Sequence, residues 1–138
     1  DLQIKNIEHI RDFLDTFVTW ASAQPDIQAI ALVGSYARGE ARADSDIDLV
    51  ILTDQSQKYR KDLKWIEGFG SVEKHQIEDY GNLTSLRVWY QDGNEVEYGI
   101  TTPDWAATPL DSGTREVIRG GMIVLFERRD LLSRHMKH

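Results

Sequence analysis

The sequence contains no cysteine and no long uninterrupted run of apolar residues. Without cysteine there is no disulfide bond, no thiolate zinc site and no cysteine nucleophile, so any bound metal must be held by oxygen or imidazole ligands. No apolar run reaches the roughly 18 residues that a membrane span requires, and the N-terminus lacks the layout of a secretory signal. These absences predict a cytoplasmic protein with no membrane partner.

Positive charge is also scarce, because the net charge is −7. An acidic surface repels a phosphate backbone, so we expect no extended nucleic-acid binding. Hydrophobic residues make up 41% of the 138 residues, a balance typical of a folded globular chain. This length favours a single domain, which we place over residues 1–138. Residues 115–138 are net basic, which suits either an ordinary solvated helix or a surface for an anionic partner.

The hydrophobic pattern predicts an α/β fold. Apolar residues recur at steps of three and four across residues 3–22 and predict an amphipathic helix. Two runs joined through Asp92-Gly93-Asn94 predict a hairpin, because these turn residues tolerate positive φ. A turn or short helix follows the first strand, and residues 102–113 form a wrapping loop. Strands are expected at 27–33, 47–53, 72–79, 83–91, 95–101 and 122–127, and further helices at 57–67, 114–119 and from 130 onward.

Of these strands, residues 72–79 have the weakest pattern, so we expect a mixed sheet of about five strands. The alternation of strands with helical segments places the helices mainly on one face of that sheet.

The residues that carry chemistry lie between the end of the first predicted strand and the start of the second. Gly34 allows close backbone approach, and Ser35 opens a turn whose free N–H groups favour an anion such as a triphosphate. Asp46 and Asp48 are two residues apart on a strand and therefore point the same way. Two neighbouring carboxylates are costly without a cation between them, and Mg²⁺ prefers such carboxylates together with phosphates. This stretch predicts a nucleotide and metal site.

A site for two metal ions usually needs a third carboxylate from elsewhere in the sheet. The second hairpin strand offers Glu97 between apolar neighbours, and we choose it as the third acid. Glu95 lies on the same face by the strand period of two and is the alternative, although it is closer to the turn.

The pattern Gly34-Ser35, ten residues, then Asp46-x-Asp48 resembles the signature of the DNA polymerase beta nucleotidyltransferase superfamily. The small size resembles the minimal members, among them antibiotic-modifying enzymes and antitoxins that modify a toxin. The resemblance implies a polymerase beta palm-like fold in which Asp46, Asp48 and Glu97 are catalytic and hold two Mg²⁺ ions. It also implies that the Gly-Ser turn binds the β- and γ-phosphates of the nucleotide.

The implied reaction moves a nucleoside monophosphate from an NTP, with ATP the expected donor, to an acceptor hydroxyl and releases pyrophosphate. Ser35 would bind phosphate through its hydroxyl and its backbone. Arg38 and Arg42 lie one turn apart and could steady the pyrophosphate, although at least one of them is better interpreted as a surface arginine. Ser45 would either bind phosphate or orient Asp46.

The chain departs from antibiotic-modifying relatives downstream, where residues 102–138 are too few for the helical domain that completes their acceptor pocket. We therefore expect a homodimer or a partner protein to complete the pocket. The leading hypothesis is a small-molecule acceptor, with antibiotics as one class. Modification of a partner protein by an antitoxin-like enzyme is the alternative, and a non-catalytic nucleotide-binding module is the third.

Overall fold

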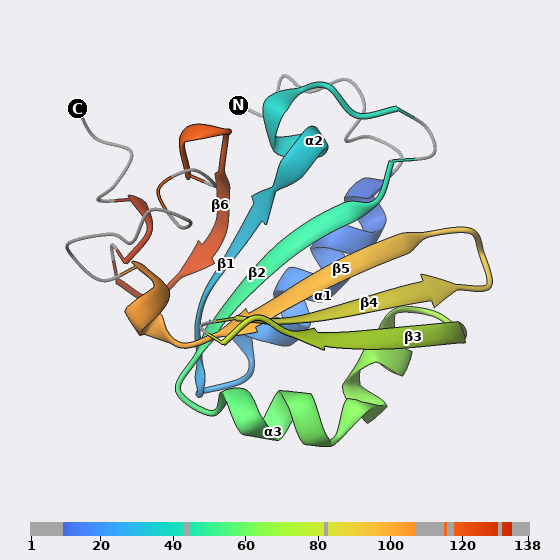
Figure 1. The fold of residues 1–138 in the computed structure, drawn as a ribbon, viewed down its shortest axis with the longest axis horizontal. Helices are drawn as coiled ribbons and strands as arrows, with labels where there is room; N and C mark the ends of the chain where they lie inside the picture. The colour runs from blue at the N-terminus through green and yellow to red at the C-terminus, as the bar shows by residue number, and fades with distance from the viewer. Residues whose placement is uncertain are drawn as a thin grey trace.

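The computed structural model describes residues 10–42, 45–81, 83–106, 115, 118–129 and 131–133. Its centre is a six-stranded sheet in the order β3-β4-β5-β2-β1-β6 (Figure 1). Strands β2 and β5 are parallel, and the other neighbouring pairs are antiparallel. The strands are β1 Ile27–Val33, β2 Ile47–Thr53, β3 Val72–Asp79, β4 Thr84–Tyr90, β5 Glu95–Thr101 and β6 Ile123–Glu127.

The expected mixed α/β sheet is thus confirmed, with six strands where about five were expected. Strand β3, which had the weakest predicted pattern, forms at the predicted residues 72–79 and lies at one edge of the sheet, where nearly all of its residues are exposed. An edge strand buries little, so its hydrophobic pattern is weak in the sequence. No helix in the described part of the chain is long and apolar enough to cross a membrane.

The helices lie mainly on one face of the sheet. Helix α1, Arg11–Ser22, crosses behind the sheet in Figure 1 and buries Leu14, Phe17 and Ala21 against it. The part of the predicted helix over residues 3–9 lies outside the described residues.

The predicted helix over residues 57–67 is wrong in one respect, because it forms two pieces. Helix α3, Ser56–Lys61, is followed by the 3-10 helix η2, Leu63–Phe69. The break is at Asp62, whose backbone is extended and whose carboxylate accepts a hydrogen bond of 3.1 Å from the Lys64 backbone N–H. Asp at such a position caps a new helical start, which explains the interruption.

The larger core cluster lies between the sheet and these helices. Phe17 is fully buried, and its ring centroid lies 5.2 Å from that of Phe69 and 5.6 Å from that of Tyr98. The Tyr98 and Tyr90 hydroxyls lie 2.8 Å apart, and the Tyr90 hydroxyl donates to the Ile66 carbonyl. These bonds satisfy the polar ends of two buried aromatic side chains.

A smaller cluster covers the opposite face at the β1–β2 side, where Trp105 of the 3-10 helix η3, Pro103–Ala106, packs with Val50 and Leu52. The described start of the predicted wrapping loop is therefore a 3-10 turn, and residues 107–113 lie outside the described residues. In the predicted helices at 114–119 and from 130 onward, residues 115, 118 and 119 are helical and 131–133 form a turn. The rest of both segments, 114, 116, 117, 130 and 134–138, lies outside the described residues.

Replacing Phe17 with alanine tests the core. Because the ring is fully buried among aromatic neighbours, Phe17→Ala is expected to lower the free energy of unfolding by about 3–5 kcal/mol. Ile77→Ala on edge strand β3, where 44% of the side chain is exposed, should change it by no more than about 0.5 kcal/mol. Urea unfolding measures both, and similar losses for the two variants would contradict this assignment of the core.

Candidate functional site

The strand register places three functional side chains in one row across the sheet. Asp48 on β2 lies opposite Glu97 on β5, and Glu97 lies opposite Arg87 on β4. Residues directly opposite on neighbouring strands point to the same face. That face is the one opposite α1, because the alternate residues Val96 and Tyr98 belong to the core on the α1 side.

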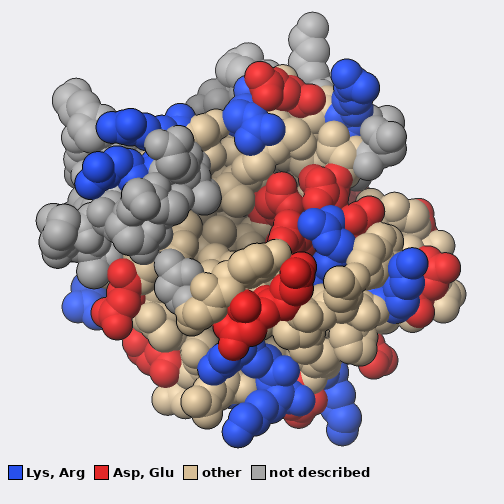
Figure 2. Space-filling view, viewed as in Figure 1, with Lys and Arg blue, Asp and Glu red and all other residues tan. Residues whose placement is uncertain are grey.

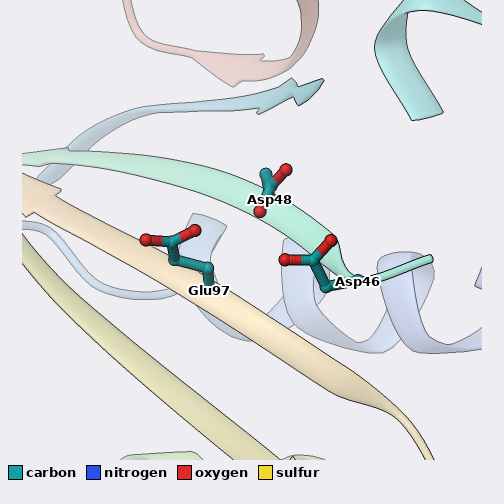
Figure 3. A group of neighbouring side chains, drawn as sticks. All are labelled: Asp46, Asp48 and Glu97. Carbon is teal, nitrogen blue, oxygen red and sulfur yellow. The ribbon is translucent and has the colours of Figure 1, made fainter. Parts of the chain in front are cut away.

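Three carboxylates meet on this face. Asp46, Asp48 and Glu97 each offer an oxygen atom, and these atoms all lie within 4.8 Å of one another. Figure 3 shows the three side chains on the same side of the β2–β5 pair. All three are half-buried. Glu95 is not part of this group, so the structure brings Glu97 rather than Glu95 to the aspartate pair.

Arg87 joins the acids and was missed in the sequence. Its guanidinium forms ion pairs with Asp46 at 2.9 Å, Glu95 at 2.5 Å and Glu97 at 3.0 Å. The predicted hairpin could have revealed Arg87. Counting residues back from the turn Asp92-Gly93-Asn94 along both strands pairs residue 87 with residue 97.

Asp48 lies in an environment that disfavours its negative charge. Its burial, with the negative charges of Asp46 and Glu97, raises the pKa of Asp48 to about 8. Its buried Oδ1 has no hydrogen-bond partner among the described residues. A buried carboxylate oxygen without a partner is costly, and a hard divalent cation would supply what it lacks. The acid group therefore fits a metal ion.

Glu97 is held by the Ser85 hydroxyl as well as by Arg87. Ser85 Oγ donates to Glu97 Oε2 at 2.5 Å, and Arg87 donates to the other oxygen, Oε1. Ser85 lies two residues before Arg87 on β4, so both donors come from the same face of one strand. The carboxylate is therefore fixed in orientation from two sides.

Gly34 begins the short helix α2, Gly34–Arg38, directly after β1. Its φ is +76°, and a Cβ atom at this position would lie 2.1 Å from Asp48 Oδ2. The missing side chain leaves the space that the Asp48 carboxylate occupies. Ser35, the next residue, lies in the first turn of α2 and is half-buried.

Of the other residues predicted to bind phosphate, Arg38 lines the cavity beside the acids, whereas Arg42 and Ser45 are not among its lining residues. The Arg38 guanidinium forms an exposed ion pair of 2.9 Å with Glu40. Arg42 is exposed, and its backbone N–H donates to Ser45 Oγ at 2.7 Å. The Ser45 hydroxyl thus closes the loop before β2.

A cavity of about 330 Å³ lies next to the acid group, lined among others by Gly34, Arg38, Asp48, Glu97 and Trp105. Figure 2 shows this face of the molecule, with acidic side chains gathered beside a hollow and a basic side chain among them. Volumes of a few hundred Å³ are typical of small-molecule sites.

Comparisons with known proteins identify the family of the chain and structures with a similar fold. A family model described as a nucleotidyltransferase domain matches residues 7–101. The structure is similar to an aminoglycoside 6-adenyltransferase from Bacillus subtilis, with 18% identity, a TM-score of 0.57, and 70% of this chain and 36% of that chain covered. It is also similar to a cytoplasmic RNA terminal U-transferase, with 20% identity, a TM-score of 0.50, and 69% and 31% covered.

The chain thus spans about a third of the length of these two structures. No curated protein sequence matches the chain. At these identities the structural likeness concerns the fold alone. The matched segment of the family model contains the Gly-Ser turn and all three acids of the group.

Substituting Gly34 tests its close approach to Asp48. Gly34→Ala is expected to lower the free energy of unfolding by more than the roughly 1–2 kcal/mol of left-handed backbone strain, because the Cβ also displaces the carboxylate. Gly39→Ala is the matched control, since Gly39 has φ +73° and no atom within 4 Å of an added Cβ. Equal losses in urea unfolding would contradict the steric argument.

The raised pKa of Asp48 predicts a pH dependence of the metal-free protein. The folded state holds this proton more tightly than the unfolded state, so the resulting stabilisation is complete below about pH 4 and is lost as the pH rises to about 8. Asp48→Asn should therefore gain stability over the wild type as the pH rises across this range, and none at pH 4.

Urea unfolding in EDTA at pH 4, 6 and 8 measures the difference. Asp15→Asn, at an exposed position on α1, controls for the loss of one negative charge. If the wild type and Asp48→Asn follow the same pH course, the Asp48 carboxyl is not perturbed in the folded state.

Proposed function

This chain belongs to the nucleotidyltransferase domain family, of the DNA polymerase beta type, and from that premise we propose that it transfers a nucleoside monophosphate from an NTP, with ATP as donor, to a hydroxyl of a small molecule. In this reaction the acceptor oxygen bonds to the α-phosphorus, the bond from that phosphorus to the β-phosphate oxygen breaks, and pyrophosphate leaves. The hydroxyl proton passes to solvent. The observation that carries the proposal is the meeting of Asp46, Asp48 and Glu97 beside the Gly-Ser turn.

Two Mg²⁺ ions would be held by this acid group: Asp46 and Asp48 would bind both, and Glu97 would bind one of them. When bound, Mg²⁺ supplies positive charge to the triphosphate and lowers the pKa of the acceptor hydroxyl. Asp48 would contribute its unpartnered Oδ1. Ser85 keeps Glu97 turned towards the aspartates, because its hydroxyl holds one carboxylate oxygen.

The triphosphate would lie over α2 at the edge of the cavity. We assign phosphate binding to Gly34 and Ser35 through their backbone and the Ser35 hydroxyl, and to Arg38 through its guanidinium. The exposed ion pair of Arg38 with Glu40 is worth little energy, so a phosphate can replace it. Arg42, whose side chain is exposed, would contact the pyrophosphate. Ser45, whose hydroxyl closes the loop before β2, would bind phosphate or orient Asp46.

Two observations support a small-molecule acceptor. The cavity beside the acids has the size of a small-molecule site, and the fold is similar to that of an enzyme named for an aminoglycoside. Antibiotics with free hydroxyls are therefore the first class to screen. A second copy of the chain or a partner protein would complete the acceptor side, and a cytoplasmic location would supply the nucleotide.

The choice of third acid is tested by paired variants. Titration calorimetry with a non-hydrolysable ATP analogue and Mg²⁺ is expected to show binding to the wild type that disappears in EDTA. Asp48→Ala and Glu97→Ala should each weaken the metal-dependent binding about 100-fold or more, because each removes an oxygen ligand of the ion. Glu95→Ala is the matched control on the same strand and should weaken it far less.

A larger loss in Glu95→Ala than in Glu97→Ala would move the third ligand to Glu95. Metal-independent binding in the wild type would contradict the proposed transfer and favour a non-catalytic nucleotide-binding module. No binding in the wild type would contradict both. Transfer itself is then followed as pyrophosphate release across a panel of hydroxyl acceptors and candidate partner proteins. Release that needs a partner protein as acceptor would favour the antitoxin-like alternative.

A further inference from the structure

Arg87 is the one cation with an ion pair to the acid group among the described residues. It lies in the middle of β4, with about a third of its side chain exposed, and its guanidinium reaches carboxylates from two other elements. Nη1 contacts both Asp46 and Glu95, and Nη2 contacts Glu97. A planar guanidinium carries five N–H donors in a rigid fork, so it can hold three carboxylates in a fixed arrangement.

The charge balance around Arg87 is unequal. Four carboxylates, those of Asp46, Asp48, Glu95 and Glu97, crowd around one positive charge. Three of them, Asp46, Asp48 and Glu97, form the group that fits a metal ion, and Arg87 is ion-paired with two of these three, Asp46 and Glu97. A divalent ion at that group and the guanidinium of Arg87 therefore draw on the same carboxylates, and the two positive charges repel each other at short range.

We propose that Arg87 is the resident counter-cation of the acid group and sets its affinity for divalent ions. The inference rests on the proposed function, because the ion in question is the one that serves nucleotide transfer. Without an ion, Arg87 neutralises Asp46 and Glu97 and holds them near the positions at which they would bind one. Against a free ion, Arg87 competes for the same oxygens, so the unaided site binds metal weakly.

The role has a consequence for nucleotide binding. A triphosphate brings negative charge and oxygen ligands of its own, which offset the repulsion between Arg87 and a divalent ion. Arg87 thus favours an ion that arrives together with the nucleotide over a free ion. It is a positioning residue that acts through Asp46 and Glu97, because its guanidinium is ion-paired with carboxylates. Among the described residues that line the cavity, its ion pair is with Glu97 alone.

The test measures Mn²⁺ binding to the full chain without nucleotide, by titration calorimetry and by the loss of the free-ion paramagnetic resonance signal. Arg87→Gln is expected to bind Mn²⁺ at least about tenfold more tightly than the wild type, because the competing charge is gone. Lys74→Gln is the matched control. It removes one positive charge from the neighbouring strand β3, where Lys74 lies 4.7 Å from the Trp89 ring centroid, and should leave the affinity unchanged.

Thermal unfolding provides the second readout. In EDTA, Arg87→Gln should melt at a lower temperature than the wild type, because the acids lose their counter-cation. Added Mn²⁺ should then raise its melting temperature more than that of the wild type. A side chain that serves packing alone would lower the melting temperature without this metal-dependent recovery.

Equal or weaker Mn²⁺ binding by Arg87→Gln than by the wild type overturns the inference, and so does an absence of binding to both. If the wild type still binds the ATP analogue with Mg²⁺, the proposed function stands without it. Tight Mn²⁺ binding by Arg87→Gln with no nucleotide binding in either protein would support the inference and contradict the proposed function. Should Arg87→Gln fail to fold, Arg87→Met, which also removes the charge and keeps an unbranched side chain, must bind Mn²⁺ more tightly than the wild type.

Discussion

The parallel pairing of β2 with β5 is the constraint on which the rest of the site depends. It sets Asp48 directly opposite Glu97, and a slip of one residue would bring Val96 or Tyr98 to that position and turn Glu97 towards α1. Tyr98 prevents such a slip, because its buried ring packs against Phe17. The alternation that builds the core on one face of the sheet therefore builds the acid group on the other.

The acid group, where the chemistry is proposed, contains an electrostatically unfavourable side chain, Asp48. Asp48 has a buried oxygen without a partner, and its pKa is raised by burial and by two neighbouring acids. In the core, by contrast, the buried hydroxyls of Tyr90 and Tyr98 are hydrogen-bonded. Perturbed carboxylates beside a cavity are a mark of functional sites, since a stable fold has no use for them otherwise. The aromatic core offsets what the acid group costs.

The sequence predicted the structure well wherever a short motif or the strand period of two determines which residues lie together. The β5 bounds, the aspartate pair and the meeting of Glu97 with that pair all followed from the strand period of two and the hairpin turn. The break at Asp62 did not, because a local side-chain cap competes with a helical pattern that continues through it. Arg87 was missed because its role depends on cross-strand neighbours, which become visible only when the register is counted.

The contact between Gly34 and Asp48 also limits how this sequence can change. The carboxylate fills the space that any side chain at position 34 would need, so the two positions form one steric unit although they lie on different elements. A larger residue at position 34 becomes tolerable only after the acid at position 48 has been shortened or lost. Among descendants of this chain, a residue other than glycine at position 34 would therefore mark a protein in which the proposed metal ligand Asp48 has already been replaced.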